Sequence, residues 1–238
     1  MNRYRAVLFD WVGTLVHLQS GRWRLRRAHE ALGRVYDDNG IEALALALRD
    51  AHGLPDVQDA IRIEDHSAAH FRAASLLWFT TAGLDPDLAD ALHAMSSNPR
   101  THPPYPESRA VLSSLHQRGV RIGVVSDFSF DLRPAMVEHG FTEFVDDIVI
   151  SFEHGFQKPD PRMFTTALDL LEVQASETLM VGDRASHDGA AAAVGIDTLI
   201  LPMPDEVSHP RLARVMLLIR EPGEYGGVVP RLGHPRRE

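Results

Sequence analysis

Five side chains with the chemistry to handle a phosphoryl group follow strand-like stretches of the sequence. They are a carboxylate at Asp10, a hydroxyl at Ser126, an ammonium at Lys158 and an acidic pair at Asp183 and Asp188. In open parallel sheets, ligands bind where the carboxyl ends of the strands meet, so we expect these side chains to share one edge. A carboxylate there can attack phosphorus and form an aspartyl-phosphate, which divides one difficult hydrolysis into two easier steps. The set therefore predicts phosphoryl-transfer chemistry with Asp10 as the nucleophile.

The charges in this set must be balanced before an anion can attack a phosphate dianion. Lys158 can lie against both the nucleophile and the phosphoryl oxygens, and Ser126 can donate a hydrogen bond to a phosphoryl oxygen. Asp10, Asp183 and Asp188 would repel one another in one cleft without a cation. Because oxygen-only ligands beside a phosphate indicate Mg²⁺, we expect these three aspartates to form a magnesium site.

Lysine occurs only once in the chain. Of the 24 basic residues, 23 are Arg and only Lys158 is Lys. Any step that needs an amine has this one side chain available. The retention of a lysine before Pro159 in so Arg-biased a chain favours a functional role over a surface position.

The elements that must position these residues alternate between strands and helices. Short apolar runs that end at polar turns are typical of buried parallel strands, while Pro near the start and Gly after the end delimit the helices. Strands are predicted at 5–9, 120–125, 145–151, 177–181, 196–201 and, at an edge, 215–219. Helices are predicted at 106–118, 130–139, 161–171 and 187–194. This alternation predicts an α/β fold with a Rossmann-like parallel sheet and helices on both faces.

Residues 18–100 differ from the rest of the chain. They are rich in Ala and Leu, with apolar residues at helical spacing and no strand pattern, and Gly-containing breaks divide them into four or five predicted helices. We expect an inserted helical domain that returns through the stiff, proline-rich segment 101–106. The sheet domain then comprises residues 1–17 and 101–222, and the tail 223–238, rich in Gly, Pro and Arg, is expected to be loosely ordered.

Composition excludes several classes of protein. The 238 residues, 44% apolar and 24% charged, are typical of a soluble globular chain of one or two domains. A net charge of -9 argues against nucleic-acid binding, and no apolar run is long enough to span a membrane. The absence of Cys excludes disulfides and thiol chemistry. The N-terminus lacks the pattern of a signal peptide, so we expect a cytoplasmic monomer or homodimer whose partner is a small anionic substrate.

Four segments, in order and in spacing, resemble the four motifs of the haloacid dehalogenase-like hydrolase superfamily. They are FDWVGTLV (9–16), VVSDFS (124–129), KPDPRMF (158–164) and VGDRASHD (181–188). The resemblance covers residues 1–17 and 100–220, and residues 18–100 match the cap of this family in position and helicity.

The resemblance implies a role for each motif residue. It implies that Asp10 is the nucleophile and that Ser126 and Lys158 hold the transferred group. It also implies that Asp183 is the acidic metal ligand, with Asp188 as a further ligand or its supporting partner. Near these, Trp11, Thr14 and Asp127 are candidates for contact with the substrate.

The sequence departs from the family pattern at Val12. Phosphatases of this superfamily usually carry a second Asp at this position as general acid and base, a role that typically contributes about 10²–10⁴-fold to the rate. Metal binding need not suffer, because the resemblance implies that the backbone carbonyl of Val12 is the ligand. A phosphatase would then need a good leaving group or another proton donor, for which His17, Asp127 and a histidine of residues 18–100 are candidates.

Three alternatives to a phosphatase remain open. A 2-haloacid dehalogenase using Asp10 needs no acid, although its family pattern has Tyr at the position of Val12 and no acidic fourth motif. A phosphonate hydrolase commonly shares the first motif but needs a lysine in the cap, which has none. A non-catalytic ligand-binding or regulatory protein would explain Val12 but not the retention of the other five residues.

Two features of residues 18–100 invite a functional interpretation. His66 and His70 lie four residues apart, which predicts one helical face, but no third metal ligand is evident and a solvent-facing pair is favoured. The basic run 22–27 could present a guanidinium to an anionic substrate, although such runs are more often solvated.

Overall fold

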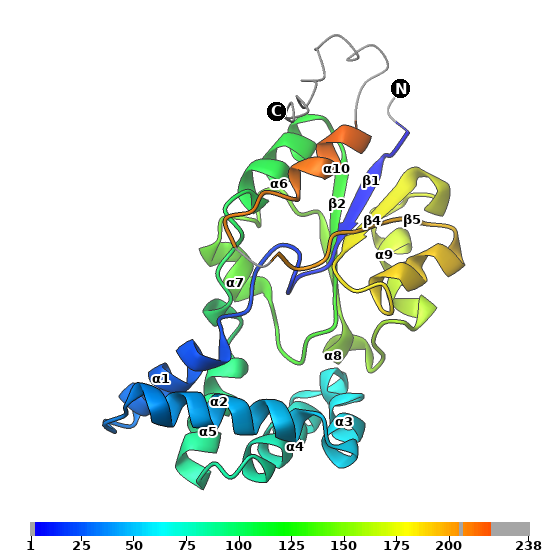
Figure 1. Cartoon of the computed structure of the whole chain (residues 1–238). Coiled ribbons are helices and arrows are strands. Elements are labelled where there is room, and N and C mark those ends of the chain that lie inside the picture. Colours follow the sequence, from blue (N-terminus) through cyan, green and yellow to red (C-terminus); the bar gives the residue numbers. More distant parts are fainter. Residues whose placement is uncertain (1–2, 205–206, 220–238) are drawn as a thin grey trace, which may run out of the picture.

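The computed structural model describes residues 3–204 and 207–219, and its five strands form one parallel sheet in the order β3-β2-β1-β4-β5. The strands are β1 (Ala6–Phe9), β2 (Arg121–Ser126), β3 (Asp147–Ile150), β4 (Thr178–Gly182) and β5 (Asp197–Ile200). Because β1 lies between β2 and β4, the first strand of the chain ends at the centre of the carboxyl edge of the sheet (Figure 1).

The alternation of side chains along the strands divides the core into two layers. In β1, Val7 and Phe9 belong to one buried cluster, while Ala6 and Leu8 belong to the other. The first cluster includes residues of α6 (Ser108–Gln117), α7 (Arg133–Glu138) and α10 (Ala213–Leu218). The second includes residues of α9 (Pro161–Leu171) and the 3₁₀ helix η4 (Asp188–Val194). The α/β class with helices on both faces of the sheet is thus confirmed.

Two predicted elements differ from the structure. The predicted edge strand 215–219 is wrong, because these residues largely form α10. Val215 and Ile219 are fully buried whereas Leu217 and Leu218 are exposed, and this spacing of four residues is that of a helix packed on one side. The predicted helix 187–194 exists, but it is the tighter 3₁₀ form.

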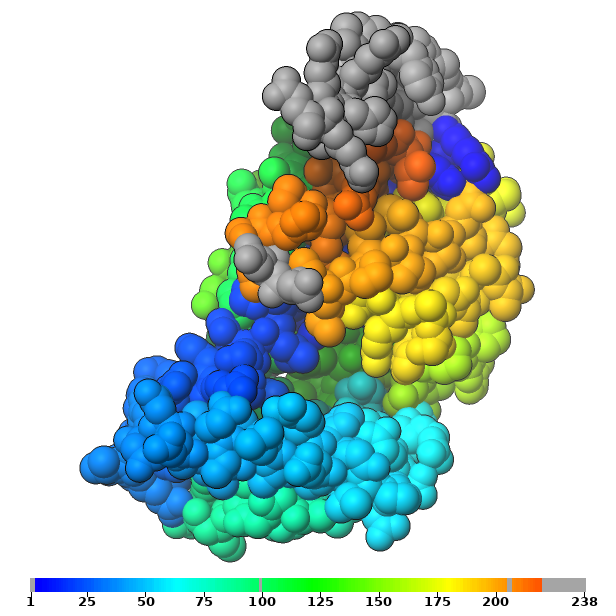
Figure 2. Space-filling view, in the orientation of Figure 1, coloured from blue at the N-terminus to red at the C-terminus, as the bar shows by residue number. Residues whose placement is uncertain are grey.

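Residues 18–100 form a layer of helices on the side of the sheet where the strands end (Figure 1). These helices are α1 (Gly21–Ala31), α2 (Asp38–His52), α3 (Pro55–Ile61), α4 (Ala68–Thr81) and α5 (Pro86–Ser96), with short 3₁₀ turns η1 (Glu64–His66) and η2 (Pro99–Thr101). Four of the helices begin at a side chain that caps a free amide, Ser20, Asp37, Ser67 and Asp85. The layer has its own apolar cluster, and its surface forms a separate lobe in Figure 2.

Two further short helices complete the sheet domain. Helix α8 (Ser151–His154) directly follows β3, and the 3₁₀ turn η3 (Ala175–Glu177) precedes β4. Within the described ranges, no helix is long and apolar enough to cross a membrane.

Gly123 in β2 allows close packing between the sheet and α9, which gives a test of the fold. A Cβ at this position would lie 2.8 Å from a methyl carbon of Leu8 and 3.1 Å from one of Leu171, and both side chains are buried. We expect Gly123→Ala to lower the free energy of unfolding by about 1–3 kcal/mol, as overpacking does, measured by urea denaturation. Gly21→Ala, where a Cβ meets nothing within 4 Å, is the control. Equal stability of the two variants would contradict this packing.

Candidate active site

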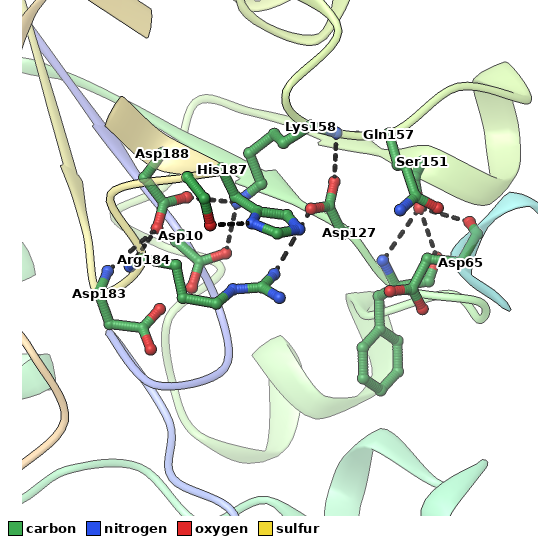
Figure 3. Close-up of polar contacts among 12 residues, drawn as sticks. Asp10, Asp65, Asp127, Ser151, Gln157, Lys158, Asp183, Arg184, His187 and Asp188 are labelled. Carbon is green, nitrogen blue, oxygen red and sulfur yellow. Dashed lines mark hydrogen bonds and ion pairs between the residues drawn. The ribbon is translucent and has the colours of Figure 1, made fainter. Parts of the chain in front are cut away.

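The centre of the site is a buried ammonium held between two carboxylates. Asp10 directly follows β1, and Lys158 lies in the loop before α9. The Nζ atom of Lys158 donates to Oδ1 of Asp10 at 2.7 Å and to Oδ1 of Asp188 at 2.6 Å. The Lys158 side chain is 0% exposed and the Asp10 side chain 5% exposed. The structure therefore brings together the nucleophile candidate, the only lysine and one of the fourth-motif acids, from segments 30 and 148 residues away from Lys158 (Figure 3).

Burial and pairing act in opposite directions on these three groups. Burial raises the pKa of Asp10 to about 7, although Lys158 acts to lower it. Burial alone would lower the pKa of Lys158, but Asp10, Asp127 and Asp188 outweigh it and hold that pKa above its ordinary value. Burial acts to raise the pKa of Asp188, yet Lys158 and backbone amides hold it below the usual range. The ammonium is thus the group that keeps negative charge in the site.

Asp188 is fixed by the turn that follows β4. Its Oδ2 accepts the backbone N–H of Asp183 at 3.0 Å and that of Arg184 at 2.9 Å. Gly182 makes this possible, because a Cβ on Gly182 would overlap the Asp188 carboxyl group. The turn therefore holds a carboxylate against its own backbone and aims the other oxygen at Lys158.

Asp183 completes a cluster suited to a cation. One carboxylate oxygen from each of Asp10, Asp183 and Asp188 lies within 4.8 Å of the others. Oδ1 of Asp183 is buried without a hydrogen-bond partner in the described part of the chain, and burial together with Asp188 raises the pKa of Asp183. Gly13, at φ 90°, lets the first-motif turn lie close to the Asp183 carboxylate, because any Cβ there would lie 2.6 Å from Oδ2 of Asp183. Three converging oxygen donors fit a hard divalent cation.

The other residues predicted near Asp10 fall into two groups. Ser126 is buried at the end of β2, and the hydroxyl of Thr14 donates to Oδ2 of Asp10 at 3.4 Å. Trp11, by contrast, is 0% exposed and packs in the core, with its ring 6.1 Å from His139 and 5.9 Å from Phe141. Trp11 therefore belongs to the core below the loop, and its contact with a substrate stays a prediction.

Asp127 is a buried carboxylate that contacts the loops carrying Lys158 and Arg184. Its Oδ1 accepts the backbone N–H of Lys158 at 2.8 Å, and its Oδ2 lies 3.5 Å from the Arg184 guanidinium. The side chain is only 1% exposed, and direct contact with a substrate stays a prediction. Asp127 connects the second motif to the loops that carry Lys158 and Arg184.

A cleft of about 630 Å³ lies between the sheet domain and the helical layer. From the helical layer it is lined by residues near the end of α3 and on η1, and from the sheet domain by the loops after α8 and β4. The lining residues are Gln58, Ile61, Arg62, Glu64, Asp65, Gln157, Lys158, Pro159, Asp160, Arg184, Ser186 and His187. The cleft thus reaches the central lysine from the side of the helical layer.

The proton donors and the guanidinium expected from the sequence are not among the residues that line this cleft. His17 packs against Tyr105, with 5.4 Å between the ring centroids. His66 lies on η1 and His70 on α4, so they are not on one helical face as predicted, although their rings are 6.1 Å apart. In the basic run, Arg22, Arg26 and Arg27 pair with carboxylates of the helical layer itself.

Sequence reasoning missed two carboxyl groups that the helical layer brings to the cleft. Burial raises the pKa of Glu64 to about 8 and that of Asp65 to about 6. Asp65 accepts from the Ser129 hydroxyl at 2.9 Å, and the carbonyl of Asp65 accepts from Ser151 at 2.6 Å, so η1 is fastened to the sheet domain (Figure 3). No sequence motif predicts these contacts, because they form only where the helical layer meets the sheet domain.

Comparison with known proteins places this geometry in a family. Residues 4–195 match the family model for haloacid dehalogenase-like hydrolases. The chain is 34% identical to a phosphoserine phosphatase of Thermus thermophilus, over 85% of this chain and 74% of that protein. Shorter matches cover 43% of a ribulose-1,5-bisphosphate 5-phosphatase of Halopiger xanaduensis, at 36% identity, and 47% of (S)-2-haloacid dehalogenase 1 of a Pseudomonas species, at 32%. They cover 42% and 47% of this chain.

The fold is also found among solved structures. The magnesium-bound crystal structure of the HAD-hydrolase YfnB of Bacillus subtilis superposes with a TM-score of 0.69 over 92% of this chain and 99% of that one, at 19% identity. At this level of sequence identity, the similarity supports the fold and nothing about the activity.

The raised pKa of Glu64 predicts a pH-dependent stability. The folded protein binds a proton at this carboxyl up to a pH of about 8, whereas an unfolded Glu releases it near about 4.3. Stability contributed by this group is therefore lost as the pH rises between these values. We expect the difference in Tm, Glu64→Gln minus wild type, to increase between pH 5 and pH 8. Thermal denaturation at each pH measures it. Asp56→Asn, at an exposed position of α3, is the control, and a Tm difference independent of pH would contradict the assignment.

Proposed function

This chain belongs to the haloacid dehalogenase-like hydrolase family and is a hydrolase, and from that premise we propose that it is a Mg²⁺-dependent phosphatase of a small phosphorylated metabolite. The observation that carries the proposal is the convergence of Asp10, Asp183 and Asp188 beside one buried ammonium. A dehalogenase expels a halide and has no need for three carboxylates around a cation site. Phosphoryl transfer does, because a carboxylate must approach a dianion.

The first half of the proposed reaction uses Asp10 as the nucleophile. An oxygen of Asp10 bonds to phosphorus as the bond to the leaving-group oxygen breaks, giving an aspartyl-phosphate. The leaving group departs as its oxyanion and takes its proton from water. Lys158, already 2.7 Å from Asp10, neutralises charge on the nucleophile and on the phosphoryl oxygens. The Ser126 hydroxyl, at the neighbouring strand end, donates to a phosphoryl oxygen. In the second half, water attacks the phosphorus as its bond to the Asp10 oxygen breaks, which gives inorganic phosphate, a proton to solvent and the free Asp10 carboxylate.

The acidic cluster is proposed to hold Mg²⁺. Asp10, Asp183 and the backbone carbonyl of Val12 would be the ligands, and Asp188 adds charge while it orients Lys158 and the turn after β4. When bound, the ion supplies charge neutralisation to the phosphoryl group. Without the ion, one oxygen from each of the three carboxylates would lie within 4.8 Å of the others. Among the described residues, the Lys158 ammonium would be the one positive charge bonded to Asp10 and Asp188.

We propose that residues 18–100 act as the cap of the site. The cleft lies where η1 and α3 meet the loops of the sheet domain, so a substrate must enter between the two. Closure over the cleft would exclude water and select small molecules. Arg62 and Arg184 on opposite walls suit an anionic metabolite. The phosphoserine phosphatase relative acts on such a molecule, which makes phosphoserine one of the substrates to be tried.

Replacement of the nucleophile tests the reaction class. Asp10→Asn keeps the shape of the side chain but cannot form an aspartyl-phosphate, so we expect phosphate release to fall by at least about 10³-fold, the order seen when a nucleophile is removed. Hydrolysis of p-nitrophenyl phosphate with Mg²⁺ is the measurement, and Asp56→Asn, at an exposed position that is not part of the cleft lining, serves as control. Activity surviving in a folded Asp10→Asn variant would refute the proposed role.

Metal removal separates the possible activities. With a panel of phosphate esters, acyl phosphates and 2-haloacids, we expect phosphate release with Mg²⁺ and its loss with a chelator. Halide release that persists in chelator would instead identify a dehalogenase. If no substrate turns over but a ligand raises the Tm, the protein is a binding protein on this fold.

A further inference from the structure

The first-motif turn is held from behind by a buried guanidinium that belongs to none of the four motifs. Arg211 lies just before α10 and is 3% exposed. It lies beyond residue 195, where the match to the family model ends. We propose that Arg211 is a positioning residue for the metal site, acting through the backbone of Gly13 and Thr14, an inference that rests on the proposed function.

The guanidinium connects two turns through their carbonyl oxygens. One terminal nitrogen donates to the carbonyl of Gly13 and also lies 3.4 Å from that of Thr14. The other donates to the carbonyl of Leu201 and lies 3.3 Å from that of Pro202. Because the fork is planar and rigid, it fixes the distance between the first-motif turn and the segment after β5.

Further contacts hold Arg211 at its guanidinium face and at its backbone. Its guanidinium carbon lies 4.5 Å from the centroid of the Tyr105 ring, in the range of a cation–π contact. Its backbone N–H and that of Leu212 each donate to Oε1 of Glu107 at 2.6 Å. Tyr105 in turn donates its backbone N–H to the carbonyl of Leu15 at 3.1 Å. The same arginine therefore braces both connections between the sheet domain and residues 18–100.

The position of the Gly13 peptide matters because it lies against the acidic cluster. The Cα of Gly13 approaches Asp183 so closely that a Cβ would lie 2.6 Å from its carboxylate oxygen. Val12, whose carbonyl is a proposed ligand, immediately precedes Gly13. Release of the Gly13 carbonyl would thus let the turn move relative to Asp183 and change the spacing of the proposed ligands. Partners that orient metal ligands from outside the site typically contribute about 10–100-fold to metal affinity or activity.

The test is the affinity of the metal-free protein for Mn²⁺, measured by calorimetric titration well below the Tm of each variant. We expect Arg211→Ala to bind Mn²⁺ about 10–100-fold more weakly than wild type. Arg211→Lys is expected to be weakened too, because one ammonium cannot serve carbonyls of both turns. Arg214→Ala, on the same segment at an exposed position, should bind as wild type does. Methylguanidinium added to Arg211→Ala should restore part of the lost affinity and of kcat.

The outcomes separate this inference from the function on which it rests. If Arg211→Ala and Arg211→Lys lower the Tm but bind Mn²⁺ as tightly as wild type, Arg211 is merely structural and the inference is overturned. If Arg211→Ala does not fold, the Arg211→Lys variant decides by itself. An Mn²⁺ affinity of Arg211→Lys equal to that of wild type then overturns the inference. If wild type itself binds no Mn²⁺, the proposed metal site is refuted, and with it the function on which this inference rests.

Discussion

The site depends on one interaction, the ammonium of Lys158 buried between Asp10 and Asp188. An ammonium without partners would be costly to bury, and so would either carboxylate. Together they form a partly neutralised cluster at the sheet edge. The backbone amides of Asp183 and Arg184 donate to the second oxygen of Asp188, and Asp127 accepts the backbone N–H of Lys158. The proposed nucleophile therefore lies beside its own counter-charge, and the remaining negative charge lies beside Asp183, where a cation fits.

The surrounding elements serve this cluster at short range. The central position of β1 places Asp10 between the loops after β2 and β4, and two glycines, Gly13 and Gly182, allow backbone to approach the carboxylates where any side chain would intrude. The helical layer adds a wall that carries Glu64 and Asp65 and is fastened by Ser129 and Ser151. In the proposed function, the sheet domain supplies the reacting groups and the inserted helices act as the cap.

Much of this arrangement could be predicted from the sequence, because strand-end residues of a parallel sheet have their neighbours dictated by topology. Asp10 and Asp183 directly follow β1 and β4 and meet for that reason. Lys158 and Asp188 join them, as expected, from the segments that come after β3 and β4. The sequence is less informative where tertiary packing determines the secondary structure or the burial of a side chain. The apolar run 215–219 suits a strand, yet Val215 and Ile219 are buried on one side of a helix. The burial of Trp11 in the core likewise depends on packing with residues far along the chain. Glu64 and Arg211 carry no local signal, since contacts across 65 to 198 residues of sequence define their surroundings.

The most direct test of the central claim is to trap the covalent intermediate. Turnover of p-nitrophenyl phosphate with Mg²⁺ should be stopped by rapid acid quench, followed by peptide mass spectrometry of the protein. The account predicts a phosphoryl group on Asp10, in the peptide that contains the first motif. Phosphate release without any adduct on Asp10, or an adduct on a different residue, would contradict it.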